Sequence, residues 1–413
     1  MRRILIIIFV LILVGTGVWY FYIRPMQNGA ATVPSLLQPF FPSVTTNPNG
    51  SFGEEDTSLN GPTPVATAAV LKQLTARPIA GFTIFSTSKT ISIPAADPKE
   101  KPTITTVVDH FVRYVSRANG YVYEIKNAEI PLQISNIFIP NVYEAYFADS
   151  NNTALLRFLR ANSQTIATYS IPIPPLNIDG TRTQKSGVYL PDNISALAVS
   201  ADQKQVARIT HDKNGAIVTT SNSAGTGSRV VARSPFQQWL VQWNTKNIFL
   251  QTKAAATADG FLYSIDAASA RLRRVTGMIK GMTASVSPLG TYVLYSESTA
   301  TGFTTTLFNT KTNATNQINL SILPEKCTWL KNEDLICAGN SSVADAVYPD
   351  NWYAGITHFS DKLYHINAAT NTYELVYNGE SQSFDMTGLM ADEDQKLVFF
   401  IDKTTGLLWS YKY

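Results

Sequence analysis

The chain has 413 residues, of which 15% are charged, and its formal net charge is +3. So small an excess of positive charge gives no reason to expect a nucleic acid as partner, because such proteins carry a strong basic footprint. The 19 Tyr and 20 Phe accompany many Thr, Val and Ile residues, a composition typical of β-structure.

Residues 1–24 are predicted to form a transmembrane signal-anchor. After two arginines, residues 4–23 are 20 consecutive uncharged and strongly apolar residues. At a helical rise of about 1.5 Å per residue, this segment spans a hydrocarbon core of about 30 Å. Trp19, Tyr20 and Tyr22 lie at its far end, where an aromatic belt is expected. The membrane itself is therefore the first predicted partner, through residues 4–23.

A cleavable signal peptide is the alternative for this segment. Gly15 and Gly17 would then supply the small residues of a cleavage site, and the protein would be secreted. We favour the uncleaved anchor, because no A-x-A sequence is present and aromatic residues follow at once. Arg2 and Arg3 precede the span, whereas only Arg24 follows it closely and residues 25–71 contain no Lys or Arg. The positive-inside rule thus predicts a single-pass protein of the cytoplasmic membrane, with its N-terminus inside and the rest outside.

Residues 25–69 are predicted to be a flexible linker. They are rich in Pro, Thr and Asn, and they show neither helical nor strand periodicity. Chains of this composition bury too little apolar surface to fold by themselves.

The clearest structural unit of the chain runs from Gly281 to Leu320. It contains four short runs typical of strands, at residues 282–287, 291–297, 304–309 and 315–320. The first two flank the turn sequence Pro288-Leu289-Gly290, and a polar turn separates the last two. Four antiparallel strands in about 40 residues are one blade of a β-propeller.

The same unit recurs at a constant spacing. The first strand of successive blades can be anchored at Val199, Trp243, Val286 and Trp329, which are 44, 43 and 43 residues apart. Two looser blades precede Val199, the first of them with an insertion around residues 89–106. The next first strand after Trp329 lies near residue 390, so the sixth blade also carries an insertion. Residues 70–413 are therefore predicted to be an all-β, seven-bladed propeller of four-stranded antiparallel blades.

The sequence also predicts how the ring closes. The chain ends on a third strand, so the last blade lacks its fourth. Residues 71–75 align without gaps on residues 272–276, which form a fourth strand in their own blade. We therefore expect residues 71–75 to complete the blade that begins at Met386, which leaves no unpaired radial edge.

Strand–turn–strand units such as SVSPLGTYVLYSES (residues 285–298) and AVSADQKQVARIT (residues 198–210) resemble the Ser-Pro-Asp-Gly-Lys repeat of the WD40-like and TolB-like propeller superfamily. The resemblance covers roughly residues 70–413. Ser-Pro-Leu-Gly and Ser-Ala-Asp-Gln replace the usual turn residues, and Trp-Asp dipeptides are absent. The resemblance implies a propeller that most often serves as an interaction scaffold, although some propellers of this kind cap hydrolases.

Motifs of catalysis are absent from the sequence. It contains no G-x-S-x-G, no H-E-x-x-H, no C-x-x-C and no Walker loop. We therefore expect no enzyme activity, no metal and no cofactor. His110, His211 and His365 fall on or beside predicted strands and are interpreted as structural. His358, with Asp350 and Asp361 near the sixth-blade insertion, leaves a metal or acid–base role open, and residues 392–394 are interpreted as a solvated hairpin tip.

The two cysteines lie on either side of a polar turn. Cys327 and Cys337 would face each other in a hairpin centred on residues 331–334, at a separation suited to a disulfide. An extracytoplasmic location permits oxidation, so we predict a bridge; two buried thiols are the alternative.

The sixth-blade insertion is the predicted partner-binding surface. Residues 339–355 place Tyr348, Trp352 and Tyr353 in an otherwise polar, turn-like segment. Exposed aromatic residues on a rigid scaffold are typical anchors for partners. The alternative is that Trp352 and Tyr353 tuck into the propeller face and plug it.

Two functions of different classes follow. The favoured one is a membrane-anchored, extracytoplasmic scaffold that binds another envelope protein or a polymer. The alternative is an envelope enzyme or a carbohydrate-binding module that uses the central channel. An enzyme should show several convergent ionisable groups at one mouth of the channel, whereas a scaffold should show an apolar or aromatic patch there.

Overall fold

The computed structural model describes residues 70–93, 103–161, 164–177, 182–380 and 382–413. The predicted membrane anchor (residues 1–24) and linker (residues 25–69) lie outside these residues, and their predictions stay untested. Within the described ranges, no helix combines the length and apolar character needed to cross a membrane.

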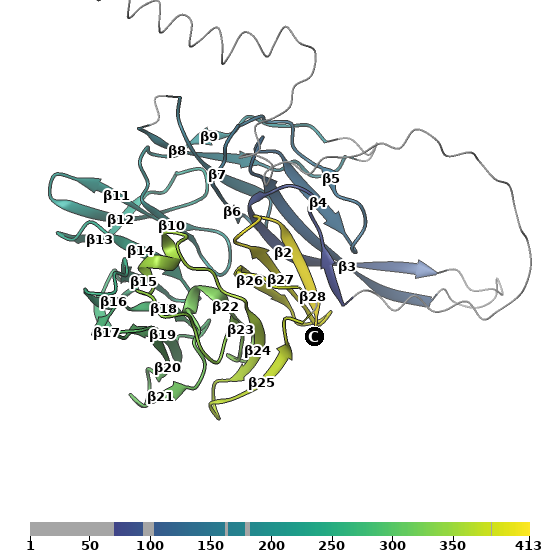
Figure 1. Ribbon diagram of the computed structural model, residues 1–413. Helices are drawn as coiled ribbons and strands as arrows, with labels where there is room; N and C mark the ends of the chain where they lie inside the picture. Colours follow the sequence, from purple (N-terminus) through teal and green to yellow (C-terminus); the bar gives the residue numbers. More distant parts are fainter. Residues whose placement is uncertain (1–69, 94–102, 162–163, 178–181, 381) are drawn as a thin grey trace, which may run out of the picture. The chain divides into compact units, whose positions relative to one another are not determined.

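The described chain forms seven four-stranded antiparallel sheets (Figure 1). Blade one is β2 to β5 (Ile79–Ile93, Thr103–Ser116, Val122–Lys126, Leu132–Gln133). Blade two is β6 to β9 (Glu144–Ala148, Thr153–Leu159, Ile166–Pro172, Val188–Tyr189). Blade three is β10 to β13 (Ala196–Val199, Val206–Asp212, Gly215–Ser221, Arg229–Ser234). The predicted all-β propeller with seven four-stranded blades is confirmed.

The remaining blades repeat this plan. Blade four is β14 to β17 (Trp239–Trp243, Asn247–Thr252, Asp259–Asp266, Leu272–Lys280), and blade five is β18 to β21 (Thr283–Val286, Tyr292–Ser298, Phe303–Asn309, Thr315–Ile318). Blade six is β22 to β25 (Cys327–Trp329, Leu335–Gly339, Lys362–Asn367, Thr372–Tyr377). Blade seven is β26 to β28 with β1 (Met386–Asp392, Leu397–Asp402, Leu408–Lys412, Leu71–Gln73).

Apolar side chains from neighbouring blades pack face to face and form the core. Between blades three and four, for example, Ile209 and Val218 are buried in one cluster with Ile248 and Ile265. Alternation along each strand supplies these inward-facing residues, because successive side chains point to opposite faces of a sheet. The ring is therefore held by contacts between adjacent blades.

The ring closes as predicted. Strand β1 pairs antiparallel with β28, with Leu71 opposite Tyr411 and Gln73 opposite Trp409. The Leu74 amide continues the ladder with a 2.8 Å hydrogen bond to the carbonyl of Leu408. A fourth strand from near the start of the propeller thus completes the blade that ends the chain.

The insertion expected at residues 89–106 takes a different form. Strands β2 and β3 run on as one ladder, in which Lys89 faces Val107 and Ile93 faces Thr103. The Ser, Thr, Ile and Val residues of this stretch favour extended backbone, so the hairpin lengthens instead of looping out. In Figure 1 the pair projects beyond the other strands of its blade.

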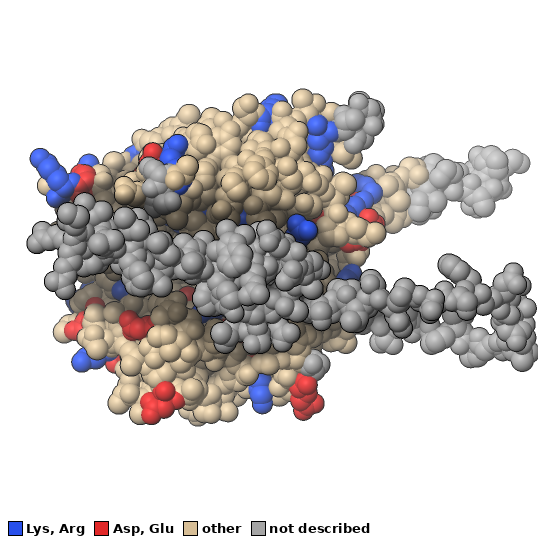
Figure 2. Space-filling model, turned by 45° about the horizontal axis from the view of Figure 1, so that its top comes forward, with Lys and Arg blue, Asp and Glu red and all other residues tan. Residues whose placement is uncertain are grey.

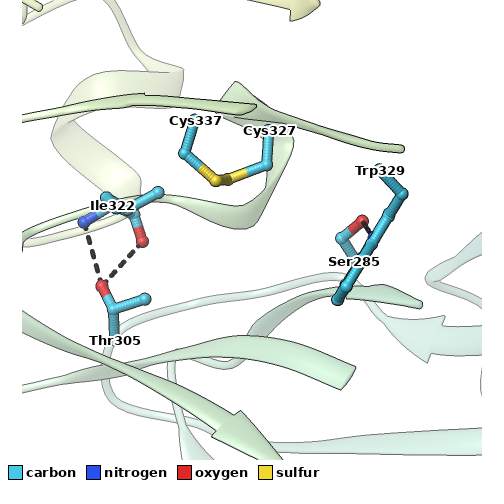
Figure 3. Close-up of a disulfide and its surroundings, with 6 residues drawn as sticks. All are labelled: Ser285, Thr305, Ile322, Cys327, Trp329 and Cys337. Carbon is cyan, nitrogen blue, oxygen red and sulfur yellow. Dashed lines mark hydrogen bonds between the residues drawn. A yellow bond between two sulfur atoms is a disulfide. The ribbon is translucent and has the colours of Figure 1, made fainter. Parts of the chain in front are cut away.

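The two cysteines are bridged (Figure 3). Cys327 on β22 lies directly opposite Cys337 on β23, with a Cα–Cα separation of 4.1 Å. The alternative of two buried thiols is thereby excluded. On the same strand, the Trp329 indole donates a 2.8 Å hydrogen bond to the hydroxyl of Ser285, which ties blade six to blade five.

Candidate functional site

The blade-six insertion, residues 340–361, joins β23 to β24 and contains the short helix α3 (Asp350–Tyr353). It contacts the loops of three other blades. The Asp350 carboxylate accepts a 2.6 Å hydrogen bond from the Ala256 amide in blade four. The carbonyls of Tyr348 and Trp352 accept hydrogen bonds from Ser298 in blade five (2.5 Å) and Lys403 in blade seven (2.6 Å). The insertion is therefore fixed to four consecutive blades.

A buried charged cluster lies where the insertion meets the ring. The Lys326 ammonium has no exposure and pairs with Asp361 at 2.7 Å and with Asp385 at 2.5 Å. It also lies 5.1 Å from the centroid of the Trp352 ring. Buried charges persist only when they are paired and hydrogen-bonded, so this cluster fixes the position of α3.

The carboxyl of Asp361 has a raised pKa. Burial raises its pKa to about 6, and the attraction of Lys326 offsets only part of this shift. The same lysine is shared with Asp385, so each carboxylate receives less than a full counter-charge.

The structure separates the three aromatic residues predicted to bind a partner. Tyr348 and Trp352 are 2% and 4% exposed, so the expectation that their rings face a partner is wrong. They pack into an apolar cluster with Phe303, Leu323 and Phe359, so Trp352 is buried as in the alternative interpretation and Tyr348 is buried with it. Tyr353 differs, because 39% of its surface is exposed. Its role in partner binding remains a prediction.

The insertion exposes two further apolar side chains that the sequence did not single out. Val347 is 49% exposed and Ile356 is 70% exposed. Their backbones are connected through Asn351, whose amide donates to the carbonyl of Val347 and whose carbonyl accepts from the amide of Ile356, both at 2.8 Å. We call Val347, Tyr353 and Ile356 the insertion patch. A single apolar residue in a polar loop carries no sequence signal of its exposure.

A cavity of about 360 Å³ opens in the central channel. Its walls come from β6, β10, β14, β18 and β22, which are the first strands of blades two to six, and from the short 3-10 helix η3 (Pro324–Lys326). Three charged residues line it: Glu144, Arg157 and Glu325. Sequence reasoning missed them, although Glu144 and Arg157 face each other across the β6–β7 hairpin. Opposite charges at facing positions of two apolar strands were the available signal.

The three charged groups are in different electrostatic states. Arg157 is buried and pairs with Glu144, which also accepts a 2.6 Å hydrogen bond from the hydroxyl of Tyr146. Glu325 accepts a hydrogen bond from the hydroxyl of Tyr353, and burial raises the pKa of its carboxyl. The insertion patch and the cavity are thus linked through one side chain, Tyr353.

Features expected of both candidate functions occur near the channel. The insertion carries an apolar patch, and the cavity carries ionisable groups. Glu144 pairs with Arg157, and Glu325 accepts from Tyr353, so each ionisable group that lines the cavity already has a protein partner.

The histidines have local partners. His110 lies 2.8 Å from Asp392, His211 lies 2.6 Å from the carbonyl of Gln237, and His365 lies 3.0 Å from Glu374. His358 approaches Asp385 at 3.7 Å, and not Asp350 or Asp361 as the sequence suggested. In the part of the chain that the structure describes, no group of three His, Cys, Asp or Glu residues is arranged to hold a metal ion.

Charged residues are scattered over the face seen in Figure 2, mostly singly or in small groups among uncharged ones. On this face the view shows neither a broad basic nor a broad acidic field, in keeping with the low net charge.

Comparison with known proteins shows likeness at the level of fold. No family model and no curated protein matches the chain. Among solved structures, TolB from Acinetobacter baumannii is 9% identical and has a TM-score of 0.40, over 73% of this chain and 80% of that one. The Cps50 (Swd1) β-propeller domain from Myceliophteria thermophila is also 9% identical, with a TM-score of 0.49, over 83% and 100%. At these TM-scores the likeness carries no argument of its own, and the propeller fold is established by the seven sheets of this chain.

Another matching structure is an oligogalacturonate lyase in complex with manganese. It is 11% identical to this chain and has a TM-score of 0.46, over 81% of this chain and 98% of that one. Likeness this distant carries no information on activity, so the function must be argued from the residues of this chain.

Proposed function

We propose that this protein is a membrane-anchored, extracytoplasmic scaffold that binds another protein of the cell envelope through the insertion patch. The observation that carries the proposal is the rigid presentation of apolar side chains. Val347 and Ile356 are exposed on a segment that is hydrogen-bonded to three other blades. The buried ion pair between Lys326 and Asp361 also holds this segment in place. Such side chains lose little conformational freedom when a partner covers them.

The kind of partner follows from the chemistry of the patch. Two exposed aliphatic side chains and a partly exposed tyrosine ring offer apolar contact, because the tyrosine hydroxyl already donates to Glu325. Aromatic and aliphatic residues of this kind form the centre of protein–protein interfaces, with polar residues around them. A protein surface with a complementary apolar patch therefore fits better than a highly charged polymer.

Two observations support the extracytoplasmic location. Residues 4–23 have the length and the flanking arginines of a signal-anchor, although they lie outside the described residues. The Cys327–Cys337 bridge suits an oxidising compartment, because disulfides are rare in the cytosol.

The proposal can be tested by replacing the patch without touching the core. A photocrosslinking amino acid at position 356 of the full-length protein should capture one envelope protein from membranes, identified by mass spectrometry. The double variant Val347→Ser/Ile356→Ser should then bind that purified protein at least tenfold more weakly, with an unchanged melting temperature.

A matched control comes from another blade. Leu272 and Met278 on β17 are 50% and 70% exposed, so Leu272→Ser/Met278→Ser removes similar apolar surface from the fourth strand of blade four. Equal binding by both double variants would reject the insertion patch as the interface.

A further inference from the structure

We propose that the central cavity binds an ammonium or guanidinium group carried on an apolar stem, with Glu325 as its ion-pair partner. This binding goes beyond the scaffold role, and its site shares one residue, Tyr353, with the insertion patch. It rests on the charges, the hydrogen bonds and the walls of the cavity.

The charge of the lining favours a cation. Two carboxylates, Glu144 and Glu325, and one guanidinium, Arg157, face the cavity. Arg157 pairs with Glu144 and also donates to the carbonyl of Ile194, so both of its terminal nitrogens are occupied. The lining therefore carries one carboxylate, Glu325, that Arg157 does not neutralise.

The sequence neighbour of Glu325 does not pair with it either. Lys326 points into the buried cluster and pairs with Asp361 and Asp385. Among the described residues, none forms an ion pair with Glu325.

An unsatisfied oxygen points to the same kind of ligand. Glu325 Oε1 accepts a hydrogen bond from the hydroxyl of Tyr353. Its Oε2 atom is buried and has no donor in hydrogen-bond geometry among the described residues, because the nearby Thr283 hydroxyl bonds to Ser296. A buried acceptor without a donor is unfavourable, and more so when it is charged. An N–H donor that also carries positive charge satisfies this oxygen and balances the carboxylate at once.

The apolar walls of the cavity determine which chemical group can accompany the cation. Leu197, Leu240 and Val241 line the same cavity, together with Ala196, Ala284 and Pro324. These side chains are complementary to an alkyl stem and contribute no charge. A volume of about 360 Å³ lies within the range of small-ligand pockets.

The chemistry excludes other ligand classes. An anion would meet two carboxylates, and although the buried Arg157 Nε has no partner within the described chain, the guanidinium already pairs with Glu144. A neutral apolar molecule would leave the Glu325 oxygen without a donor, and a neutral donor would satisfy it but leave the charge of the carboxylate unbalanced. An organic cation does both, and a free amine and a Lys or Arg side chain of a bound protein both belong to this class.

Calorimetric titration of the full-length protein tests the site with simple probes. Butylguanidinium and butylammonium should bind, whereas butanol and butyrate, which share the stem, should bind at least tenfold more weakly. Glu325→Gln keeps an acceptor for Tyr353 but removes the charge, and it should weaken cation binding at least tenfold. The control Glu380→Gln makes the same change on an exposed loop and should leave binding unaltered.

A peptide distinguishes the two sources of the cation. If acetyl-Gly-Arg-Gly-amide binds as well as butylguanidinium does, the cavity accepts a protein side chain; if only the free probes bind, it accepts a small molecule. No binding by any cation, equal binding by butanol, or full binding by Glu325→Gln would overturn the inference. If Glu325→Gln fails to fold, the unaltered protein still tests the proposal, because it should bind butylguanidinium and butylammonium more tightly than butanol.

Discussion

The indole nitrogen of Trp352 donates to both carboxylate oxygens of Asp385, at 3.1 Å to Oδ1 and 3.0 Å to Oδ2. This contact joins the blade-six insertion to the loop that precedes the first strand of blade seven. It makes Trp352 part of the core and not of the surface.

Replacement of Trp352 should therefore act on stability. Trp352→Ala removes a buried indole and one donor to Asp385, so we expect a loss of about 3–5 kcal/mol in the free energy of unfolding. Trp352→Phe keeps most of the packing and should lose about 1.5–3 kcal/mol, the usual size of a hydrogen bond to a charged group. Urea denaturation of both variants measures these losses. Unchanged stability in Trp352→Ala would contradict the packing of this ring in the core.

Removal of the closing strand should weaken the whole propeller. A chain that begins at residue 79 lacks β1 and leaves the edge of β28 unpaired. It also loses the partly buried Leu71 and Leu74 from the clusters on either side of blade seven. We expect a loss of at least about 2 kcal/mol relative to a chain that begins at residue 64, because each large apolar side chain contributes about 1.5–3 kcal/mol when fully buried. Identical melting curves for the two chains would show that closure through β1 is dispensable.

The disulfide should contribute only modestly. It closes a loop with a sequence separation of 10, and the chain-entropy estimate for so short a loop is no more than about 3 kcal/mol. The double variant Cys327→Ala/Cys337→Ala should thus still fold, with stability reduced by up to that amount. Mass spectrometry of non-reduced peptides from native membranes should find the bridge. Two freely alkylated thiols would show that the protein resides in a reducing compartment or is not oxidised there.

The carboxyl of Asp361 predicts a specific pH dependence. Its pKa is about 3.8 in an unfolded chain and about 6 in the fold. Between these values the folded protein holds a proton that the unfolded chain has released, so a rise in pH through this window favours unfolding. Asp361→Asn cannot titrate, and its stability relative to the unaltered protein should rise between pH 4 and pH 7.

The control for this experiment is Ser342→Ala, which changes an exposed residue without an ionisable group in the same insertion. Its stability difference from the unaltered protein should stay constant over the same range. If the stability of Asp361→Asn instead falls relative to the unaltered protein as the pH rises, then the attraction of Lys326 outweighs burial and the pKa of Asp361 is lowered by the fold, contrary to this prediction.

The orientation of the protein is open to a direct test. Protease added to right-side-out cells should digest the linker or the propeller, because residues 25–413 are proposed to lie outside. Sequencing of the mature N-terminus should recover the start of the chain. A mature terminus near residue 18 would instead indicate a secreted protein, and full protection of the propeller would place it in the cytoplasm.

Much of the fold could be predicted, because a propeller repeats one local plan. The turn Ser287-Pro288-Leu289-Gly290 is an example: Gly290 adopts a φ of +75°, which favours glycine, and the Tyr292 amide donates to the Ser287 hydroxyl at 3.0 Å. Strand spacing and turn chemistry are local properties, so blade count and closure followed from them.

The site depended on contacts that are distant in sequence. Trp352 is buried because Phe303 and Leu323 from blade five meet it, and no pattern within residues 339–355 reveals that neighbour. The insertion could be located by its excess length, but the direction of each aromatic ring is decided by the blade against which it packs. Glu325 likewise faces the cavity because Lys326, the next residue, is held by carboxylates from blades six and seven.

The insertion also affects the order in which the blades of the propeller can unfold. In a repeat protein each unit contacts its two neighbours, and partial opening can proceed one unit at a time. Here the hydrogen bond between Asp350 and Ala256 links blade six to blade four, across the blade between them. Blades four to seven are thus connected by one segment, and they should exchange their most protected amide protons in a single cooperative event. Local unfolding of the insertion would break the hydrogen bonds that connect these four blades at the same time.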